Sequence, residues 1–458
     1  MHRPALLLLA PFALAACAGD DTNPAVPDSG VADATVADAA TEGGAHPSSE
    51  AGVDASTDAG GDAATNGSGD AAPTDASTDA GDSKDGSTST DADVAGDTGT
   101  DASTDDASTE AGADAILSSF VTLGCNRLAK GDWVAATNPS SANVAQLQQD
   151  FTDVAAMADK PKQLFFTGDL VLGEVTQLST LSSELTGWAS LYTASPVASS
   201  LTLVAVAGNH EILLKQTLSD GGSAEIQNNA PDASADTVWT QWLAASSFDP
   251  MAGNGPTAAP PNADQLLDDQ SKFSFSFDDG PNHFVVLNTD TWTSADAGTG
   301  VAPIGRVPMV WLAGDIQAAQ ANAVTQNIFL FGHKPIISPI GSTSPDDVID
   351  PVVSGDLVTL MTGSSKVRAY FCAHYHAWDA RPLTASTSVY QVIAGNGGST
   401  LETTWNPPVT FFGFTEVRVH ASGSVGVVSY QRPVPSPYNA TTGVVAATAQ
   451  PEMMIFTP

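Results

Sequence analysis

The sequence predicts an α/β fold from Ile116 onward, in which crossover helices connect the strands of a parallel sheet. Apolar runs of strand length alternate there with segments whose apolar residues recur at helical spacing, as is typical of βαβ units. Four short polar motifs each follow such a run, where open α/β sheets bind their ligands. Roughly 340 residues are many for one core, so we expect two packed sheets flanked by helices.

Strand and helix patterns alternate regularly in the first half of this part. We expect a strand at Ser119–Leu123 and then a helix at Val144–Val154, where apolar residues share one face. A strand at Gln163–Thr167, a helix at Leu178–Leu191 and a strand at Leu201–Ala207 follow. Because crossover helices connect parallel strands, these three strands should end at the same edge of a sheet.

The second half follows a long irregular stretch, Lys215–Gln270, within which Thr237–Ala245 has a helical pattern. A hairpin is expected next, with strands at Phe273–Phe277 and Phe284–Asn288 on either side of a turn. The remaining expected helices are Val310–Ala321 and Leu357–Met361, and the remaining strands are Asn327–Phe331, Val367–Cys372, Ser388–Ala394, Phe411–His420 and Val425–Tyr430.

The first residues, 1–17, resemble a bacterial lipoprotein signal peptide. Their apolar run, Ala5–Ala16, is too short to span a bilayer and leads through small residues into Cys17, as a lipobox does. The resemblance implies cleavage before Cys17 and a diacylglycerol on its sulfur. The alternative is an ordinary signal peptide with a chance cysteine. We therefore expect a cell-envelope protein, lipid-anchored at the outer membrane or cell surface, or a secreted one.

Residues 18–115 are acidic and low in complexity, with a recurring Asp-Ala-Ser-Thr tetrapeptide and no aromatic side chain. Such a segment cannot bury enough apolar area to offset its chain entropy, so we expect a disordered linker. It holds roughly 23 acidic residues and a single lysine, and so carries much of the formal charge of −37. This charge argues against nucleic-acid binding. We expect a monomer that contacts the membrane through its lipid anchor only.

Four polar motifs carry the candidate chemistry. They are Gly168-Asp169, Gly208-Asn209-His210-Glu211, Gly332-His333-Lys334-Pro335 and Ala373-His374-Tyr375-His376. Carboxylate, amide oxygen and imidazole together form a ligand set for divalent metals such as zinc, manganese or iron. Each histidine taken singly is more simply a buried core residue, but their common register with Asp169 and Asn209 favours metal binding. Metals so placed can activate a water for attack on a phosphorus centre.

The order of these motifs is similar to that of the calcineurin-like metallophosphoesterases, which include the purple acid phosphatases, over about residues 120–430. The resemblance implies that residues 116–458 form a four-layer α/β/β/α sandwich of two mixed sheets, with one or two divalent ions (Mn, Zn or Fe). It implies that Asp169 bridges the two ions. One ion would also be held by Asn209, His333 and His374, and the other by His376. It also implies that His210 protonates the leaving group, that Glu211 orients His210, and that Asn209 contacts substrate.

The first motif departs from this family's pattern. After the first strand the family has Asp-x-His, or Asp-x-Gly in purple acid phosphatases, whereas this chain has Gly124-Cys125-Asn126-Arg127. Cys125 is open to three interpretations: a buried free thiol, a metal ligand, or a disulfide partner of Cys372. Arg127 would supply positive charge to a phosphate. Leu172 stands where the purple enzymes have a tyrosine, so a tyrosinate–iron site is not expected.

Together these features predict a hydrolase acting on phosphate mono- or diesters through metal-activated water, with His210 as the general acid. The alternative is a degenerate phosphoesterase fold that serves as a surface binding lipoprotein without catalysis. Cys125 and Arg127 motivate the alternative, whereas His210 and Glu211 favour the enzyme, because a binding protein needs no general acid. Lys334 is more simply an exposed lysine than a substrate contact.

Overall fold

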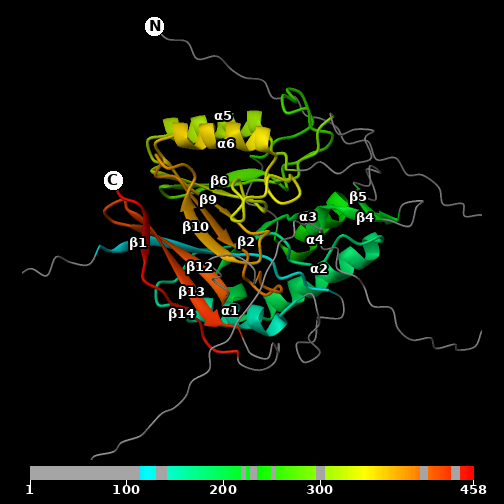
Figure 1. Cartoon of the computed structure of the whole chain (residues 1–458), viewed down its shortest axis with the longest axis horizontal. Helices are drawn as coiled ribbons and strands as arrows, with labels where there is room; N and C mark the ends of the chain where they lie inside the picture. The colour runs from blue at the N-terminus through cyan, green and yellow to red at the C-terminus, as the bar shows by residue number, and fades with distance from the viewer. Residues whose placement is uncertain are drawn as a thin grey trace, which may run out of the picture. The chain divides into compact units, whose positions relative to one another are not determined.

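The computed structural model describes residues 114–129, 142–217, 223–226, 235–248, 254–294, 305–402, 411–434 and 444–458, without the side chains of residues 215–226 (Figure 1). The chain divides into two units, residues 1–101 and 102–458, and every described residue belongs to the second. The expected signal peptide with Cys17, and the expected linker up to residue 113, lie outside the described residues. None of the described helices is long and apolar enough to cross a membrane.

The first sheet has the strand order β14-β13-β12-β1-β2-β3, with β15 paired to β13. Its parallel strands are β1 (Ile116–Leu123), β2 (Gln163–Thr167) and β3 (Thr202–Val206). Its antiparallel strands are β12 (Phe411–His420), β13 (Val425–Pro433), β14 (Thr448–Ala449) and β15 (Met453–Phe456). The parallel strands therefore bring three carboxyl ends to one edge of this sheet.

The second sheet has the order β10-β11-β9-β8-β7-β6. Its parallel strands are β7 (Asn282–Val286), β8 (Asn327–Phe331), β9 (Val367–Cys372) and β11 (Tyr390–Ala394), and its antiparallel edges are β6 (Phe275–Asp279) and β10 (Trp378–Pro382). A separate hairpin joins β4 (Leu214–Thr217) to β5 (Ser223–Ile226). Both large sheets are thus mixed.

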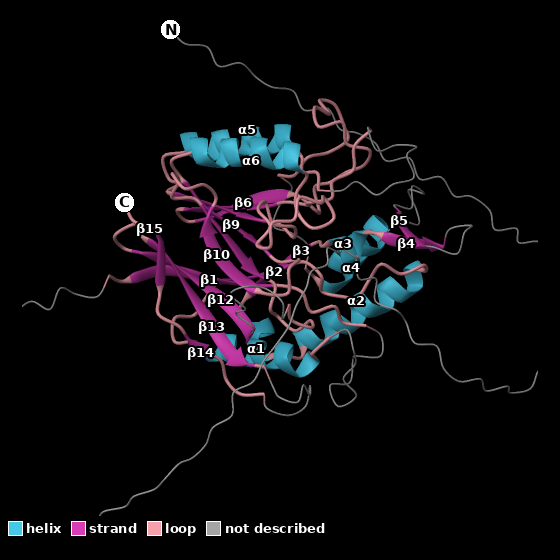
Figure 2. Cartoon of the chain, in the orientation of Figure 1, coloured by secondary structure: helices cyan, strands magenta, loops and turns pink. Residues whose placement is uncertain are grey.

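Helices cover the outer face of each sheet (Figure 2). The first sheet packs against α1 (Val144–Ala156), α2 (Leu178–Thr193) and α4 (Ala235–Ser246), and the second packs against α5 (Met309–Ala321) and α6 (Pro351–Gly363). The short elements η3 (Pro196–Ser199) and α3 (Asn209–Ile212) lie around β3. A third apolar cluster, drawn from both sheets, lies between them. These layers confirm the expected α/β/β/α sandwich.

Phenylalanines dominate the cluster between the sheets because alternate residues of a strand point to the same face. Phe120 of β1 makes edge contacts, with ring centroids 5.0–5.7 Å apart, to five other phenylalanines: Phe165, Phe284, Phe329, Phe331 and Phe371. Phe165 of β2 and Phe331 of β8 stack with ring centroids 3.7 Å apart. This contact fixes β2 beside β8, and so brings together the motifs that follow these two strands.

Several elements differ from the sequence prediction. The stretch Lys215–Gln270 is less irregular than expected, since it contains the β4–β5 hairpin as well as α4. β10 was not predicted, because Trp378–Pro382 lacks an alternating apolar pattern; it is a strand because it pairs with β11. The helix predicted at Leu357–Met361 is longer, since Asp350 caps its start by accepting the Val352 N–H.

Candidate metal centre

The predicted motifs of both sheets meet at one place. The residues after β1, β2, β8 and β9 form two groups of ligand atoms, in each of which the atoms lie within 4.8 Å of one another. One group is Asp169, His333 and His374, and the other is Cys125, Asp169 and His376. Asp169 belongs to both groups, so one carboxylate can bridge two adjacent cations.

Two glycines allow the backbone to pass through this centre. Gly168 has a φ of +89°, and a Cβ there would lie 2.4 Å from His333 Nδ1. At Gly208 a Cβ would lie 2.5 Å from Asp169 Oδ1. The glycines of the Gly-Asp and Gly-Asn motifs are therefore required by close packing around Asp169.

Four non-glycine residues of the centre also have left-handed backbone: Cys125, Arg127, Asp169 and His374, with φ between +55° and +69°. Such a conformation costs about 1–3 kcal/mol per residue and persists only where the surroundings enforce it. Around Cys125 and Arg127 they do, because the Asn126 and Arg127 amides both donate to the Asp169 carbonyl, at 2.8 and 2.9 Å. The loop after β1 is thus fastened to the loop after β2.

Asp169 is fully buried among cationic and imidazole groups. Its Oδ1 lies 3.0 Å from His333 Nε2, and its Oδ2 lies 3.0 Å from Arg127 Nε and 3.7 Å from His210 Nε2. Burial opposes ionisation, yet His210, His333 and Arg127 hold the pKa of Asp169 well below its usual range. The carboxylate is therefore ionised.

The two histidines of the first group have their ring nitrogens directed inward. His333 Nδ1 lies 2.8 Å from the Thr167 carbonyl, and its Nε2 lies 3.0 Å from Asp169 Oδ1. Burial opposes the charged ring, but Asp169 and the Thr167 carbonyl raise the pKa of His333 above its ordinary value. His374 Nδ1 lies 3.1 Å from this His333 Nε2. Burial, and then His333, lower the pKa of His374 well below its usual range, so His374 is neutral. Because neutral imidazoles are the form that binds metals, a cation bound here would displace the proton shared between His333 and Asp169.

The centre contains buried acceptors without donors. Within the described part of the chain, Asn209 Oδ1 and His376 Nε2 have no hydrogen-bond partner. An unsatisfied buried polar group costs about 1–3 kcal/mol, and a cation beside each of the two atoms would satisfy it. The residues at this edge therefore fit a divalent metal.

His210 and Asn209 are held by Glu174, which sequence reasoning did not identify. Glu174 Oε1 accepts from Asn209 Nδ2 at 3.1 Å and lies 3.3 Å from His210 Nε2, while His210 Nδ1 contacts the Leu172 carbonyl. Glu174 belongs to the loop after β2, five residues beyond Asp169, and its left-handed φ of +45° was not foreseeable from its residue type. The only sequence signal for Glu174 was its position as a polar residue shortly after the apolar run Leu170–Leu172.

Glu211 is directed at backbone amides. Its two oxygens accept the amides of Gly208 at 2.7 Å and of Asp169 and Val171, each at 3.0 Å. Burial, and then Asp169, raise the pKa of Glu211 to about 8. The side chain thus ties the motif after β3 to the motif after β2, and positions Asp169 through its backbone.

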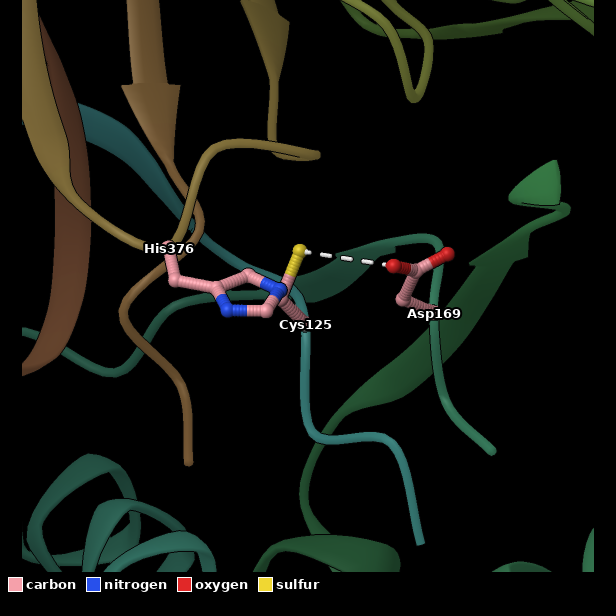
Figure 3. Close-up of side chains that lie close together, drawn as sticks. All are labelled: Cys125, Asp169 and His376. Carbon is pink, nitrogen blue, oxygen red and sulfur yellow. Dashed lines mark hydrogen bonds between the residues drawn. The ribbon is translucent and has the colours of Figure 1, made fainter. Parts of the chain in front are cut away.

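The structure rejects one of the three interpretations of Cys125. Both Cys125 and Cys372 are free thiols, so the expectation of a disulfide is wrong. The physical reason is strand alternation: Cys372 ends β9 on the face toward α5 and α6, with its Sγ 3.8 Å from the Val392 carbonyl. Cys125 Sγ instead lies 3.9 Å from Asp169 Oδ2 (Figure 3). It also accepts the His374 amide at 3.2 Å.

Lys334 is buried, which corrects the expectation of an exposed lysine. Its Nζ lies 2.7 Å from Asp290 Oδ1 and donates to the Pro345 carbonyl. A buried ammonium group is stable only with such partners. The lysine therefore ties the loop after β8 to the loop after β7, and does not face solvent.

The fold and this centre define an α/β protein with a candidate dinuclear metal site. No protein-family model matches the chain, and no curated protein does. Among solved structures, it is similar to the purple acid phosphatase PPD1 of yellow lupin (Lupinus luteus) seeds, with 16% identity and a TM-score of 0.46 over 72% of this chain and 52% of that one. This chain therefore spans about half the length of the lupin protein.

Two further solved structures show a similar level of likeness. A dimetal phosphatase from Danio rerio has 11% identity and a TM-score of 0.42, over 69% of this chain and 97% of that one. GAP50, the anchor in the inner membrane complex of Plasmodium, has 11% identity and a TM-score of 0.40, over 74% of this chain and 89% of that one. The chemistry of the centre is accordingly derived from its own side chains.

Proposed function

We propose that this chain is a metal-dependent phosphoesterase that hydrolyses phosphate mono- or diesters. The observation that carries the proposal is Asp169, an ionised and fully buried carboxylate shared by two groups of ligand atoms. Divalent metals bound there would supply Lewis-acid polarisation of the phosphoryl group and a water of lowered pKa.

The chain's residues divide into ligands and substrate contacts. In the proposal, one ion is held by Asp169, Asn209, His333 and His374, and a second by Asp169 and His376. The Arg127 guanidinium, whose side chain is 26% exposed, is the cation available to a bound phosphate. In the proposal Asn209 also contacts this phosphate, and the partner is a phosphate ester.

His210 is the proposed general acid. Its side chain is only 8% exposed and its Nε2 faces the carboxylates of Glu174 and Asp169 at 3.3 and 3.7 Å. Burial lowers the pKa of His210 below its ordinary value, and these carboxylates oppose that effect by favouring a proton on Nε2, the atom that would deliver it to the leaving oxygen. Glu211 acts indirectly, through the backbone of Asp169.

We further propose that the enzyme is a monomeric lipoprotein of the cell envelope. In this proposal Cys17 carries the lipid, residues 18–115 form the linker, and the metals are Mn, Zn or Fe.

The test is hydrolysis of p-nitrophenyl phosphate and bis-p-nitrophenyl phosphate by the chelator-treated full chain, with Mn²⁺, Zn²⁺ or Fe²⁺ added back. We expect metal-dependent turnover that Asp169→Asn abolishes. His210→Gln should lower kcat about 10²–10⁴-fold while retaining the metal. If no metal restores turnover at any pH from acid to alkaline, the proposal fails in favour of the non-catalytic binding lipoprotein.

A further inference from the structure

Cys125, Asp169 and His376 form a compact group of three different donor atoms (Figure 3). The residues follow β1, β2 and β9, so three separate strand ends bring them together. The thiol lies between the His376 ring and the Asp169 carboxylate, with Sγ 3.9 Å from Oδ2. Donor atoms around a tetrahedral zinc lie about 3.5 Å apart, so the observed spacing is close to that of a bound cation.

His376 supplies the second, independent observation. The residue is only 8% exposed, and its Nδ1 is fixed 2.7 Å from the Thr400 carbonyl. The lone pair of Nε2 is therefore aimed into the group, where it has no hydrogen-bond partner among the described residues. A buried imidazole nitrogen without a partner is the donor that a metal ion would use.

The backbone holds the Cys125 thiol in this place. The residue has a φ of +56°, and both its backbone groups are bonded: its amide donates to the Gly168 carbonyl at 3.0 Å, and its carbonyl accepts the Ser399 amide at 2.9 Å. The His374 amide donates to Sγ itself at 3.2 Å. Burial, and then Asp169, raise the pKa of the Cys125 thiol well above its usual range, so a cation bound here would have to displace the thiol proton, and the His374 amide would favour the resulting thiolate.

Cys372 provides the contrast within the same chain. It is equally buried, but it ends a regular strand and lies in the apolar cluster under α5 and α6. A cysteine that serves only as a small apolar residue is expected in such surroundings. Cys125 lies instead among a carboxylate, an imidazole and a guanidinium.

We propose that Cys125, Asp169 and His376 form a thiolate-containing cation site, chemically unlike the adjacent site of Asp169, Asn209, His333 and His374. Sulfur and imidazole donors favour Zn²⁺, Co²⁺ or Fe²⁺ over Mn²⁺, whereas the adjacent set of oxygens and imidazoles accepts Mn²⁺ readily. On binding, the thiol proton passes to solvent and a metal–sulfur bond forms. The two cation sites therefore select different metals.

Arg127 competes with a cation for the same carboxylate oxygen. Its Nε donates to Asp169 Oδ2 at 3.0 Å, and the guanidinium must leave this oxygen when the thiolate site is filled. Its partial exposure gives it a path to solvent. Arg127→Gln should therefore raise the Co²⁺ affinity of the thiolate site about tenfold or more, without changing the number of ions bound.

The experiment is a Co²⁺ titration of the chelator-treated full chain, followed by ultraviolet absorption and elemental analysis. We expect two ions per chain and a thiolate-to-cobalt charge-transfer band. Cys125→Ser should abolish the band and reduce the stoichiometry toward one ion, whereas the matched control Cys372→Ser should retain both. X-ray absorption of the wild-type zinc form should show one sulfur ligand, a readout that does not depend on how any variant folds.

Two results would overturn the inference: two bound ions with no sulfur ligation in the wild type, or an unchanged band in Cys125→Ser. The inference rests on the proposed function in sharing Asp169 and His376, to whose ion it adds a thiolate ligand, but the two can fail separately. Turnover with Mn²⁺ but no cobalt–thiolate band would remove the thiolate site and keep the phosphoesterase. A cobalt–thiolate band without turnover of either ester would keep the thiolate site and remove the phosphoesterase.

Discussion

Glu174 links His210, the proposed general acid, to Asn209, a proposed metal ligand. Its Oε1 lies 3.1 Å from Asn209 Nδ2 and 3.3 Å from His210 Nε2. By accepting from the amide nitrogen, it turns the unpartnered Asn209 Oδ1 toward the centre. Glu174 is therefore a positioning residue, which orients both groups without contacting the metal.

We predict that Glu174→Ala lowers metal affinity about 10–100-fold, as is typical for loss of a ligand's hydrogen-bond partner. Glu174→Gln keeps an oxygen that can accept from Asn209, so its metal affinity should be close to that of the wild type. It lacks the carboxylate that favours a proton on His210. Isothermal titration with Mn²⁺ measures the first effect, and the pH dependence of kcat measures the second. Asp356→Asn, an exposed carboxylate change on α6, is the charge control. Equal affinities of the Ala variant and the control would contradict this role.

Residue type and position were enough to predict most of the candidate ligands. Asp169, His333, His374 and His376 follow strand ends, and each has a nitrogen or oxygen donor within the two groups. Glu174 and the burial of Lys334 were not predictable, because each depends on the path of a loop and on a partner from another element. Cys372 is a free thiol because it lies on the strand face toward α5 and α6. Strand alternation does not state which of the two faces a residue at the end of a strand occupies.

At the scale of elements, a buried ion pair joins α1 to β13. Arg432 Nη1 lies 2.7 Å from Asp150 Oδ1, and Nη2 lies 2.7 Å from Asp153 Oδ2, with the Arg432 and Asp150 side chains fully buried. Burial raises the pKa of Asp150 to about 7 despite the neighbouring Arg432, which shows how strongly this location disfavours charge. A charge left alone here would be very unfavourable.

We predict that Arg432→Met destabilises the fold by about 3–5 kcal/mol, because it leaves Asp150 without its cation. The double variant Arg432→Met with Asp150→Leu removes both charges and should regain much of this loss. Urea denaturation of the three proteins measures the free energies of unfolding. If the double variant were less stable than Arg432→Met, the loss in Arg432→Met could not be explained by the unpaired charge of Asp150. The ion pair itself would then supply the stability.

A histidine bridge joins β7 to β6 and α5 and makes stability depend on pH. His283 Nδ1 lies 2.7 Å from Asp278 Oδ1, and Nε2 lies 2.9 Å from Asp315 Oδ2. Burial opposes the charged ring, but hydrogen bonds to Asp315 and Asp278 raise the pKa of His283 above its ordinary value of 6.5. Asn254 and Ser276 also donate to Asp315 and complete the group.

Because the pKa of His283 is higher in the folded chain than in the unfolded chain, its contribution is complete below pH 6.5 and is lost as pH rises through the folded value. We predict that His283→Gln destabilises the protein by about 1–3 kcal/mol at roughly pH 5.5 and by less at roughly pH 9. Thermal unfolding at both values measures the difference. An equal or larger loss at alkaline pH would contradict the charged bridge.

At the scale of the molecule, the catalytic proposal depends on two sheets that end at one place. Alternation and helical periodicity predicted both sheets separately, including β2, β8, β9 and β12 with their observed bounds. Chain length predicted two packed sheets, but no local pattern states which strands of the two sheets oppose each other. The interlocking phenylalanines supply that information physically, and the stacked Phe165 and Phe331 bring Asp169 to His333.

Cys17 is the proposed point at which this protein is attached to the cell. If Cys17 carries a diacylglycerol, its two chains suffice for stable membrane binding without a spanning helix. Cys17→Ser should then move the protein from the membrane to the soluble fraction and remove the lipid mass from its N-terminal peptide. Specific phosphoesterase activity should stay unchanged, because every proposed ligand lies at or beyond Cys125. Fractionation with a salt wash, followed by mass spectrometry, measures both effects. Retention of Cys17→Ser in the washed membranes would show that something other than this lipid holds the protein there.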